Sequence, residues 1–289
     1  MPEASKAEVI AELRARIADF EAAGPRMEMA DEGSDARPRA VTFGASAIDG
    51  VLPGGGLRHD ALHEIVAVDY RDMGAALGFA AALAARCAEA APDAPVLWCE
   101  GGHAPFDVGA LYGPGLMAFG LDPARLIIVS PPKEIDLLWT MEEALRLGAL
   151  AAVVGEIDGR AARLDLTATR RLQLAAEESN TPAFLLTGHE SAGATAAVTR
   201  WRVGSAPSSP TVEIAGLAGL IGRPRWHVRL ERCRGTRFAA DMGGALDGEW
   251  IVEWDARTKM LHDASDADAA EVTRPARRPS LRLSRALAG

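Results

Sequence analysis

The chain has 289 residues, of which 48% are hydrophobic and 25% are charged. These proportions are ordinary for a soluble globular protein, and the length suits one large domain with additional segments at its ends. The formal net charge of −9 excludes a protein whose whole surface coats nucleic acid, although it leaves room for local basic patches.

The first predicted element is an amphipathic helix over residues 3–23, within an N-terminal segment bounded at 1–23. Its apolar residues recur at 3-4-3 spacing with charged residues between them. Residues 24–40 are polar and punctuated by Pro and Gly, which predicts a linker. The helix must cover its apolar stripe, either on its own domain or on a partner or neighbouring subunit. The stripe comprises Ile10, Leu13, Ile17 and Phe20.

From Val41 onward, short apolar runs alternate with helical patterns. The apolar runs predict strands at 61–68, 95–100, 125–130, 150–157 and 182–188. The helical patterns lie at 73–91, 106–119, 133–148 and 164–179. Such alternation is typical of βαβ units with right-handed crossovers, so we expect an α/β fold with a doubly wound, mostly parallel sheet that is buried on both faces.

After Thr195 the pattern changes to strands with few helices. The segments 199–205, 225–235 and 248–255 predict antiparallel strands that extend the sheet. We therefore bound the main domain at 41–260. Residues 261–289 have little to bury and predict a flexible tail.

The segment 225–232 alternates strictly between apolar and polar residues. Trp226, Val228 and Leu230 are expected to face the core. The residues expected to face outward are Arg225, His227, Arg229 and Glu231. A solvated edge strand, whose charges block edge-to-edge pairing, explains this pattern, and contact with DNA phosphate or an acidic partner is the alternative. The patch under that alternative comprises Arg223, Arg225, Arg229, Arg232 and Arg234.

The tail reverses its charge along its length. Residues 262–271 are acidic, whereas residues 273–289 carry five arginines, no acidic residue and several spaced leucines. Such a segment suits folding on an acidic groove or a filament, and a purely solubilising tail is the alternative. The partner-binding residues under the first hypothesis are Arg274, Arg277, Arg278, Leu281, Arg282, Leu283, Arg285 and Leu287.

The cysteines Cys87, Cys99 and Cys233 are far apart and form no CxxC pair. Because the histidines also form no metal-binding spacing, we predict neither a disulfide framework nor a metal site. The N-terminus lacks the apolar core of a signal peptide, and we identify no apolar run long enough to span a bilayer. A cytoplasmic protein with no membrane partner is the expectation.

Two passages carry a resemblance to known proteins. VTFGASAIDGVLPGGGLRHDALHEI resembles the entry into a RecA/RadA-type ATPase core, and VRLERCRG followed by WIVEWD resembles the end of the same core. The order of these passages is most similar to the ImuA family, the RecA-like members of the inducible mutagenesis (ImuA/ImuB) cassette, which are also related to SulA. The resemblance covers roughly residues 41–255 and implies a RecA-like fold.

In an active relative, the strand that ends near Ile65 leads into a G-x-x-x-x-G-K-[ST] loop that encloses the phosphates and binds Mg²⁺. This chain has no Lys, Ser or Thr there, and it places Asp69 and Asp72 where a triphosphate would sit. One close carboxylate–phosphate contact costs on the order of 4 kcal/mol. We therefore expect no catalytic residue and no cofactor. The degenerate loop comprises Val66, Ala67, Val68, Asp69, Tyr70, Arg71, Asp72, Met73 and Gly74.

Two further positions bear on catalysis under this resemblance. Gly155 stands near the place of the Walker-B Asp, so the metal-binding carboxylate is missing there. Glu100 lies where RecA-type enzymes keep the Glu that activates water, but a single Glu at a strand end is more typical of a capping residue. Both positions favour a fold without the catalytic machinery.

The resemblance implies a non-catalytic adaptor in SOS-induced translesion DNA synthesis. Its implied partners are ImuB and RecA, with an error-prone C-family DNA polymerase as an indirect partner and direct DNA contact as a further hypothesis. It also implies a homo-oligomer, because RecA relatives pack an N-terminal element, here the stripe of the first helix, on the next subunit. Two alternatives stay open: an active DNA-dependent recombinase-type ATPase and a SulA-like inhibitor of cell division.

Overall fold

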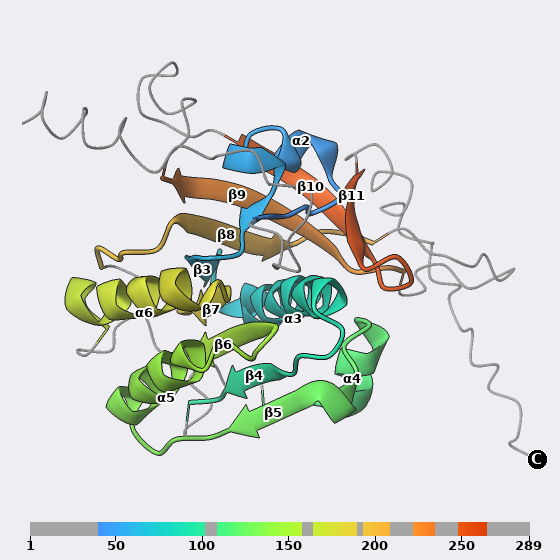
Figure 1. Ribbon diagram of the computed structural model, residues 1–289. Helices are drawn as coiled ribbons and strands as arrows, with labels where there is room; N and C mark the ends of the chain where they lie inside the picture. Colours follow the sequence, from blue (N-terminus) through green and yellow to red (C-terminus); the bar gives the residue numbers. More distant parts are fainter. Residues whose placement is uncertain are drawn as a thin grey trace, which may run out of the picture.

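The computed structural model describes residues 40–101, 109–157, 164–189, 193–208, 222–234 and 248–264. Within these ranges a nine-stranded sheet runs through the whole domain, with helices packed against it (Figure 1). This arrangement confirms the predicted RecA-like α/β fold, with a mostly parallel sheet and antiparallel C-terminal strands. The predicted N-terminal helix lies outside the described residues.

The main sheet combines a parallel and an antiparallel part. The parallel part comprises six strands, in the order β8, β3, β7, β6, β4 and β5. On the other side of β8, the strands β9, β10 and β11 are added in antiparallel orientation. From edge to edge, the strands are β11 (Met260–Ala264), β10 (Gly248–Asp255), β9 (Arg225–Cys233), β8 (Thr199–Ser205), β3 (Leu62–Ala67), β7 (Ala183–Leu186), β6 (Ala152–Glu156), β4 (Val96–Cys99) and β5 (Leu126–Val129). A separate two-stranded sheet comprises β1 (Ala40–Val41) and β2 (Leu57–Arg58).

The helical elements fall close to the predicted segments, with one exception. The predicted helix 106–119 is helical only from Gly113 among its described residues, because Gly109 has a left-handed φ of 79° and Pro114 suits a first turn. The helices are α2 (Ser46–Asp49), α3 (Met73–Ala90), α4 (Gly113–Ala118), α5 (Glu134–Arg146) and α6 (Leu166–Ser179), with 3-10 turns η1 (Pro53–Gly55), η2 (Tyr70–Asp72) and η3 (Pro123–Arg125).

Three predictions about the C-terminal strands were wrong. β8 is parallel to β3, because the chain after β7 returns to the starting end of the sheet before β8 begins. β9 is an interior strand and not an edge, since β8 and β10 flank it. The predicted tail boundary at 261 divides β11, whose fully buried Leu261 donates its N–H to the Phe43 carbonyl at 2.8 Å.

One face of the sheet is covered by α3, whose many alanines let it lie close to the strands. Large side chains fill the remaining space beside it, including Phe79, Trp201 and Trp226. By length and composition alone, the described stretch Tyr70–Ala90 could cross a membrane, contrary to our prediction that no run is long enough. Because 67% of its most apolar window is buried in the fold, packing as a central helix accounts for its composition.

The opposite face is covered by α5 and α6. Their apolar residues meet the other side of the same strands, as Leu137 and Met141 do against β6. At Gly155 the approach is closest, because a Cβ atom there would lie 2.2 Å from the Met141 Sδ atom. The strands β8, β9 and β10 bury one face in the core on the α3 side. Their other face carries polar residues.

Candidate functional site

The connection from β3 to α3, where an active relative has its phosphate loop, is a short turn closed by its own carboxylates. The Val68 N–H donates to the Val203 carbonyl at 2.9 Å and so prolongs the pairing with β8. The Asp69 carboxylate accepts from the Arg71 N–H at 2.6 Å and starts the turn η2. No residue between 66 and 74 has a positive φ, so the backbone does not form the wide, glycine-dependent curve of a phosphate cradle.

The second carboxylate of this turn attaches α3 to the sheet. The N–H and hydroxyl groups of Ser205 both donate to the Asp72 carboxylate at 2.8 Å. A Cβ atom at Gly204 would lie 3.1 Å from the Val68 side chain, so the turn packs directly on the end of β8. The two acidic residues predicted to repel a triphosphate therefore also serve as structural ties within the described turn.

The outer surface of the turn combines exposed Val68 and Tyr70 with the charged side chains of Asp69 and Arg71. Val68, Tyr70 and Arg71 are exposed, and the Tyr70 ring meets the edge of the His189 ring with centroids 6.1 Å apart. This surface lies at the carboxyl ends of β3 and β7, the edge at which open α/β sheets usually bind ligands. Its side chains offer stacking and apolar contact, as a protein partner would use.

The carboxylate at the end of β6 is Glu156, the residue after Gly155. Residues alternate along β6, so Gly155 faces Met141 on α5 whereas Glu156 faces the α3 side. Glu156 is buried and its carboxylate accepts from the Trp98 indole N–H at 2.5 Å. Burial, together with the nearby Glu100 carboxylate, raises the pKa of Glu156 to about 7. The sequence signal for it was an acidic residue at the end of an apolar strand.

Glu100 links two connecting segments in this structure and caps no described helix. Its Oε1 atom accepts from the Leu111 N–H at 2.8 Å, and its Oε2 atom accepts from the Ser130 hydroxyl at 3.2 Å. These bonds tie the chain after β4 to the chain after β5. Across the part of the chain that the structure describes, no three His, Cys, Asp or Glu side chains are grouped as a metal site.

A buried ion pair organises the polar face of the sheet. Glu64 in the middle of β3 is fully buried, and the Arg200 guanidinium on β8 donates to both of its oxygens at 2.8 and 3.0 Å. The hydroxyls of Thr187 and Thr195 donate to the same carboxylate at 3.2 and 2.8 Å. A buried charge requires such a complete set of partners. The Glu64 carboxylate therefore fixes the Arg200 side chain on β8, the strand next to β3.

Further arginines surround this ion pair. Arg232 and Arg234 both donate to the Thr195 carbonyl, at 2.9 and 3.1 Å. Burial, and the neighbouring guanidinium groups of Arg200 and Arg234, lower the pKa of Arg232. Because like charges resist such crowding, this arrangement favours an anion nearby.

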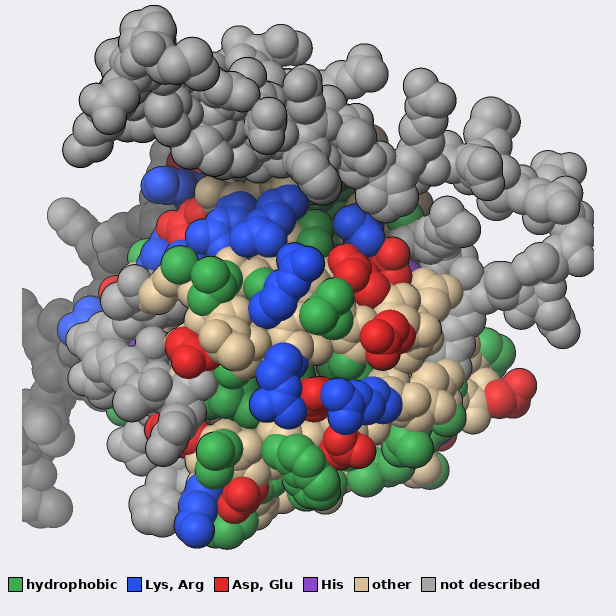
Figure 2. All heavy atoms as spheres, turned by 60° about the vertical axis from the view of Figure 1, so that its left-hand side comes forward, with side chains coloured by type: hydrophobic (Ala, Val, Ile, Leu, Met, Phe, Trp, Pro, Cys, Tyr) green, Lys and Arg blue, Asp and Glu red, His purple; other side chains and the backbone are tan. Residues whose placement is uncertain are grey.

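The rest of the group lies along β8 and β9. Arg202 pairs with Glu231, while Arg229 is exposed and has no partner among the described residues. The arginine cluster, as we define it, comprises Arg200, Arg202, Arg229, Arg232 and Arg234. Within the described chain Glu64 and Glu231 pair with two of these arginines, and Glu249 on β10 lies opposite Arg229, so five guanidinium groups stand beside three carboxylates on a protein of net charge −9. Figure 2 shows basic side chains gathered on this face, above the helical layer.

A shift of register places these residues on one face. Trp201 on β8 lies opposite Leu230, but Arg200 lies opposite Arg232, so Glu231 is an extra residue in β9. Strict alternation would turn Arg232 toward the core, and the irregularity returns it to the face that carries Arg200.

The predicted basic patch divides into two parts. Arg223 and Arg225 lie apart from the cluster in ion pairs with Glu253, at 3.4 and 2.7 Å, and Arg225 is buried although it was predicted to face outward. Its burial follows from the position of β9 inside the sheet, where β10 supplies Glu253. Arg229, Arg232 and Arg234 remain together. Sequence reasoning missed Arg200 and Arg202, whose signal was the alternating TRWRVGS segment.

The two predicted segments for partner contact lie outside the described residues. They are the self-association stripe (Ile10, Leu13, Ile17 and Phe20) and the tail residues (Arg274, Arg277, Arg278, Leu281, Arg282, Leu283, Arg285 and Leu287).

Comparison with known proteins gives two relatives. No family model matches the chain. The chain is 34% identical over 224 residues to Protein ImuA of Caulobacter vibrioides strain NA1000 / CB15N, and equally to Protein ImuA of strain ATCC 19089 / CIP 103742 / CB 15. The aligned region makes up 74% of this chain and 82% of each relative.

The raised pKa of Glu156 predicts a specific dependence of stability on pH. The folded protein keeps a proton that the unfolded chain releases near pH 4.5, so this stabilisation is complete below that pH and is lost as the pH rises through about 7. The loss is on the order of 3 kcal/mol. Glu156→Gln keeps an acceptor for Trp98 and should abolish this part of the slope in urea unfolding at pH 5.5 and 8.5.

A matched control is Glu143→Gln, which changes an exposed carboxylate on α5 and should keep the wild-type slope. Equal slopes for Glu156→Gln and the wild type would show that Glu156 does not titrate in this range.

Proposed function

The chain belongs to the ImuA family, and from this premise we propose that it is a non-catalytic RecA-like adaptor that acts with ImuB in damage-induced mutagenesis. The observation that carries the proposal is the turn between β3 and α3. Its carboxylates are engaged in holding the turn and anchoring α3 to Ser205. A nucleotide would have to break these bonds and accept their negative charge, without a lysine or a metal ligand in return.

The proposal places the adaptor in the cytoplasm. The three cysteines are buried, and burial raises the pKa of each thiol to about 12. Thiols of this kind are inert structural residues that fit a reducing compartment.

ATP turnover and capture of ImuB together test the adaptor function. We expect the purified chain to hydrolyse ATP with single-stranded DNA no faster than Glu100→Ala does. Immobilised on a support, the chain should retain ImuB. The first result follows from the closed turn, and the second from an adaptor's need to hold its partner.

Two outcomes would favour other functions. A turnover rate clearly above that of Glu100→Ala would support a recombinase-type ATPase. Retention of the tubulin-like division protein in place of ImuB would support a SulA-like inhibitor.

Direct contact with DNA is the second part of the proposal, and the arginine cluster supports it. Arg229 is exposed and unpaired within the described residues, so its guanidinium group is available to a phosphate. The alternating polar residues of β8 and β9 present a row of side chains with no helix above it in the described chain, which suits an extended backbone.

Arg229→Ala should weaken binding of single-stranded DNA in fluorescence anisotropy and reduce the slope of log K against log salt by about 0.7. Arg257→Ala is the matched control, because Arg257 is also exposed but lies at the turn between β10 and β11. If both variants bind as the wild type does, the cluster does not contact DNA.

Self-association through the N-terminal stripe is the third part. The described domain offers an apolar surface for this contact at β5, an edge strand in which Ile127 and Ile128 are 45% and 47% exposed. Uncharged, exposed edges of this kind pair readily with further chain segments.

Gel filtration with light scattering should give a smaller assembly mass per chain when residues 1–30 are removed, because the stripe is then absent. An unchanged assembly would rule out association through this segment.

A further inference from the structure

The arginine cluster adjoins an exposed aromatic ring at the carboxyl end of β3. The Arg202 guanidinium donates to the carbonyl of Ala67, the last residue of β3, at 3.3 Å. The next residue, Val68, is exposed and lies against Gly204 of β8. The Tyr70 side chain follows two residues later and is 55% exposed. Guanidinium groups and an exposed ring therefore lie close together on one surface.

The register between β8 and β9 extends this surface sideways. Arg202 lies opposite Arg229, and Gly204 lies opposite His227, whose ring is partly exposed. Because Gly204 has no side chain, no side chain of β8 separates Val68 from His227. The platform, as we define it, comprises the arginine cluster together with Val68, Tyr70, His189 and His227.

Charge alone would hold an anion on the platform only weakly. The five guanidinium groups of the cluster stand beside three carboxylates. The adjoining turn adds Arg71, but it also adds Asp69 and Asp72. The excess of positive charge is therefore small, and a nucleic acid must gain further affinity from its bases. Stacking of bases on exposed aromatic rings supplies such affinity.

Exposed rings select unpaired bases. In a duplex the faces of each base are covered by its neighbours, whereas a single strand can place a base against a ring. The Tyr70 and His189 rings meet at 80° with centroids 6.1 Å apart, so they are not stacked on each other. The guanidinium groups beside them suit the phosphates that connect successive bases, which favours a nucleic acid over a purely apolar protein partner.

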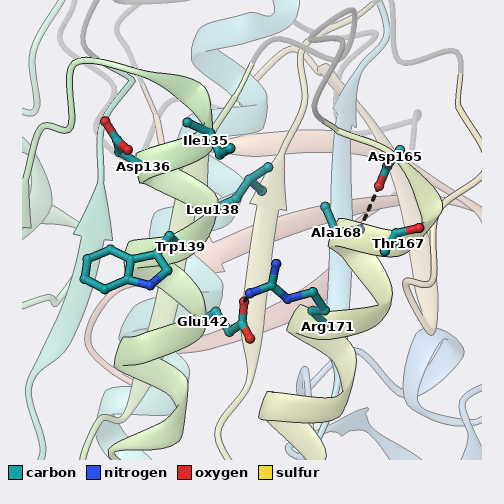
Figure 3. A pocket seen from close by; sticks show the side chains of 9 residues that line it. All are labelled: Ile135, Asp136, Leu138, Trp139, Glu142, Asp165, Thr167, Ala168 and Arg171. Carbon is teal, nitrogen blue, oxygen red and sulfur yellow. Dashed lines mark hydrogen bonds and ion pairs between the residues drawn. The ribbon is translucent and has the colours of Figure 1, made fainter.

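The helical layer separates the two kinds of side chain that the platform combines. In the groove between α5 and α6, Figure 3 shows Arg171 turned toward Glu142, with which it pairs at 2.6 Å. In the same view Trp139 points from the side of α5 that is turned away from α6. Trp139 is 59% exposed, nearly as Tyr70 is, and it therefore serves as a matched control for an exposed ring outside the platform.

We propose that the platform binds single-stranded DNA, with an unpaired base stacked on Tyr70 and the neighbouring phosphates beside Arg202 and Arg229. This inference rests on the DNA contact of the proposed function, and it adds the strand preference and the stacking residue. Because the base is held by its face and not by hydrogen bonds to its edge, binding tolerates any sequence.

Fluorescence anisotropy with the full-length chain tests the proposal. The probes have equal length: an oligothymidylate, an abasic strand that keeps the sugar phosphates without bases, a DNA duplex and an oligouridylate. We expect the oligothymidylate to bind about tenfold more tightly than the abasic strand, and more tightly than the duplex. Tyr70→Ala should remove most of this preference, whereas Tyr70→Phe should keep it because the ring remains.

Two controls separate stacking from phosphate contact. Trp139→Ala should keep the wild-type preference, because its ring lies outside the platform. Arg229→Ala should weaken the oligothymidylate and the abasic strand by the same factor, because both carry phosphates.

The outcomes distinguish this inference from the DNA contact on which it rests. Equal affinity of the wild type for the oligothymidylate and the abasic strand would overturn the stacking and leave the DNA contact intact. A full preference retained by Tyr70→Ala would do the same. Binding of neither strand would overturn the DNA contact as well. Tighter binding of the oligouridylate than of the oligothymidylate would overturn the assignment to DNA.

Discussion

The attachment of Asp72 to Ser205 is the interaction on which the arrangement of the domain depends. It joins the residue before α3 to the last residue of β8, the strand that pairs with β3. α3 in turn fills the core beside five strands, and Trp201 and Trp226 pack against it. An enclosed phosphate would need the same space and the same end of the helix. Here the Asp72 carboxylate, at the residue before the helix, is bound by Ser205 and makes no side-chain hydrogen bond to the first N–H groups of α3.

A second constraint comes from Glu64. A carboxylate in the middle of a buried strand is tolerated only with complete compensation, which Arg200 and two threonine hydroxyls supply. This requirement fixes Arg200, and Arg232 and Arg234 then gather around the Thr195 carbonyl beside it. The positive charge of this surface thus follows from the need to compensate the buried Glu64 carboxylate. Arg229, which compensates no buried charge, is the member most free to meet a ligand.

Much of the fold could be predicted from local patterns, since apolar runs and helical periodicity depend on neighbours in the sequence. The strands from β3 to β7 and the helices α3, α5 and α6 follow those patterns closely. What could not be predicted depends on pairing between distant segments. The direction of β8, the interior place of β9 and the burial of Arg225 against Glu253 all belong to this class. The face of Glu156 was missed for a related reason, because a one-residue error along a strand exchanges its two sides. β11 was missed because only Leu261 marks it as a buried strand.

The extra residue in β9 has a consequence for how this family can change its length. Loss of Glu231 would remove the extra residue and restore regular pairing, with Arg232 still opposite Arg200 and Cys233 still opposite Thr199, so both would keep their faces. A deletion in the regular part of β9 would instead turn the residues beyond it to the opposite face of the sheet. The turn at 256–259 is more constrained, since the residues beyond it are held by β10, by the Phe43 carbonyl and by the Ser46 hydroxyl. Homologous chains should consequently lose a residue more readily at the position of Glu231 than elsewhere in β9.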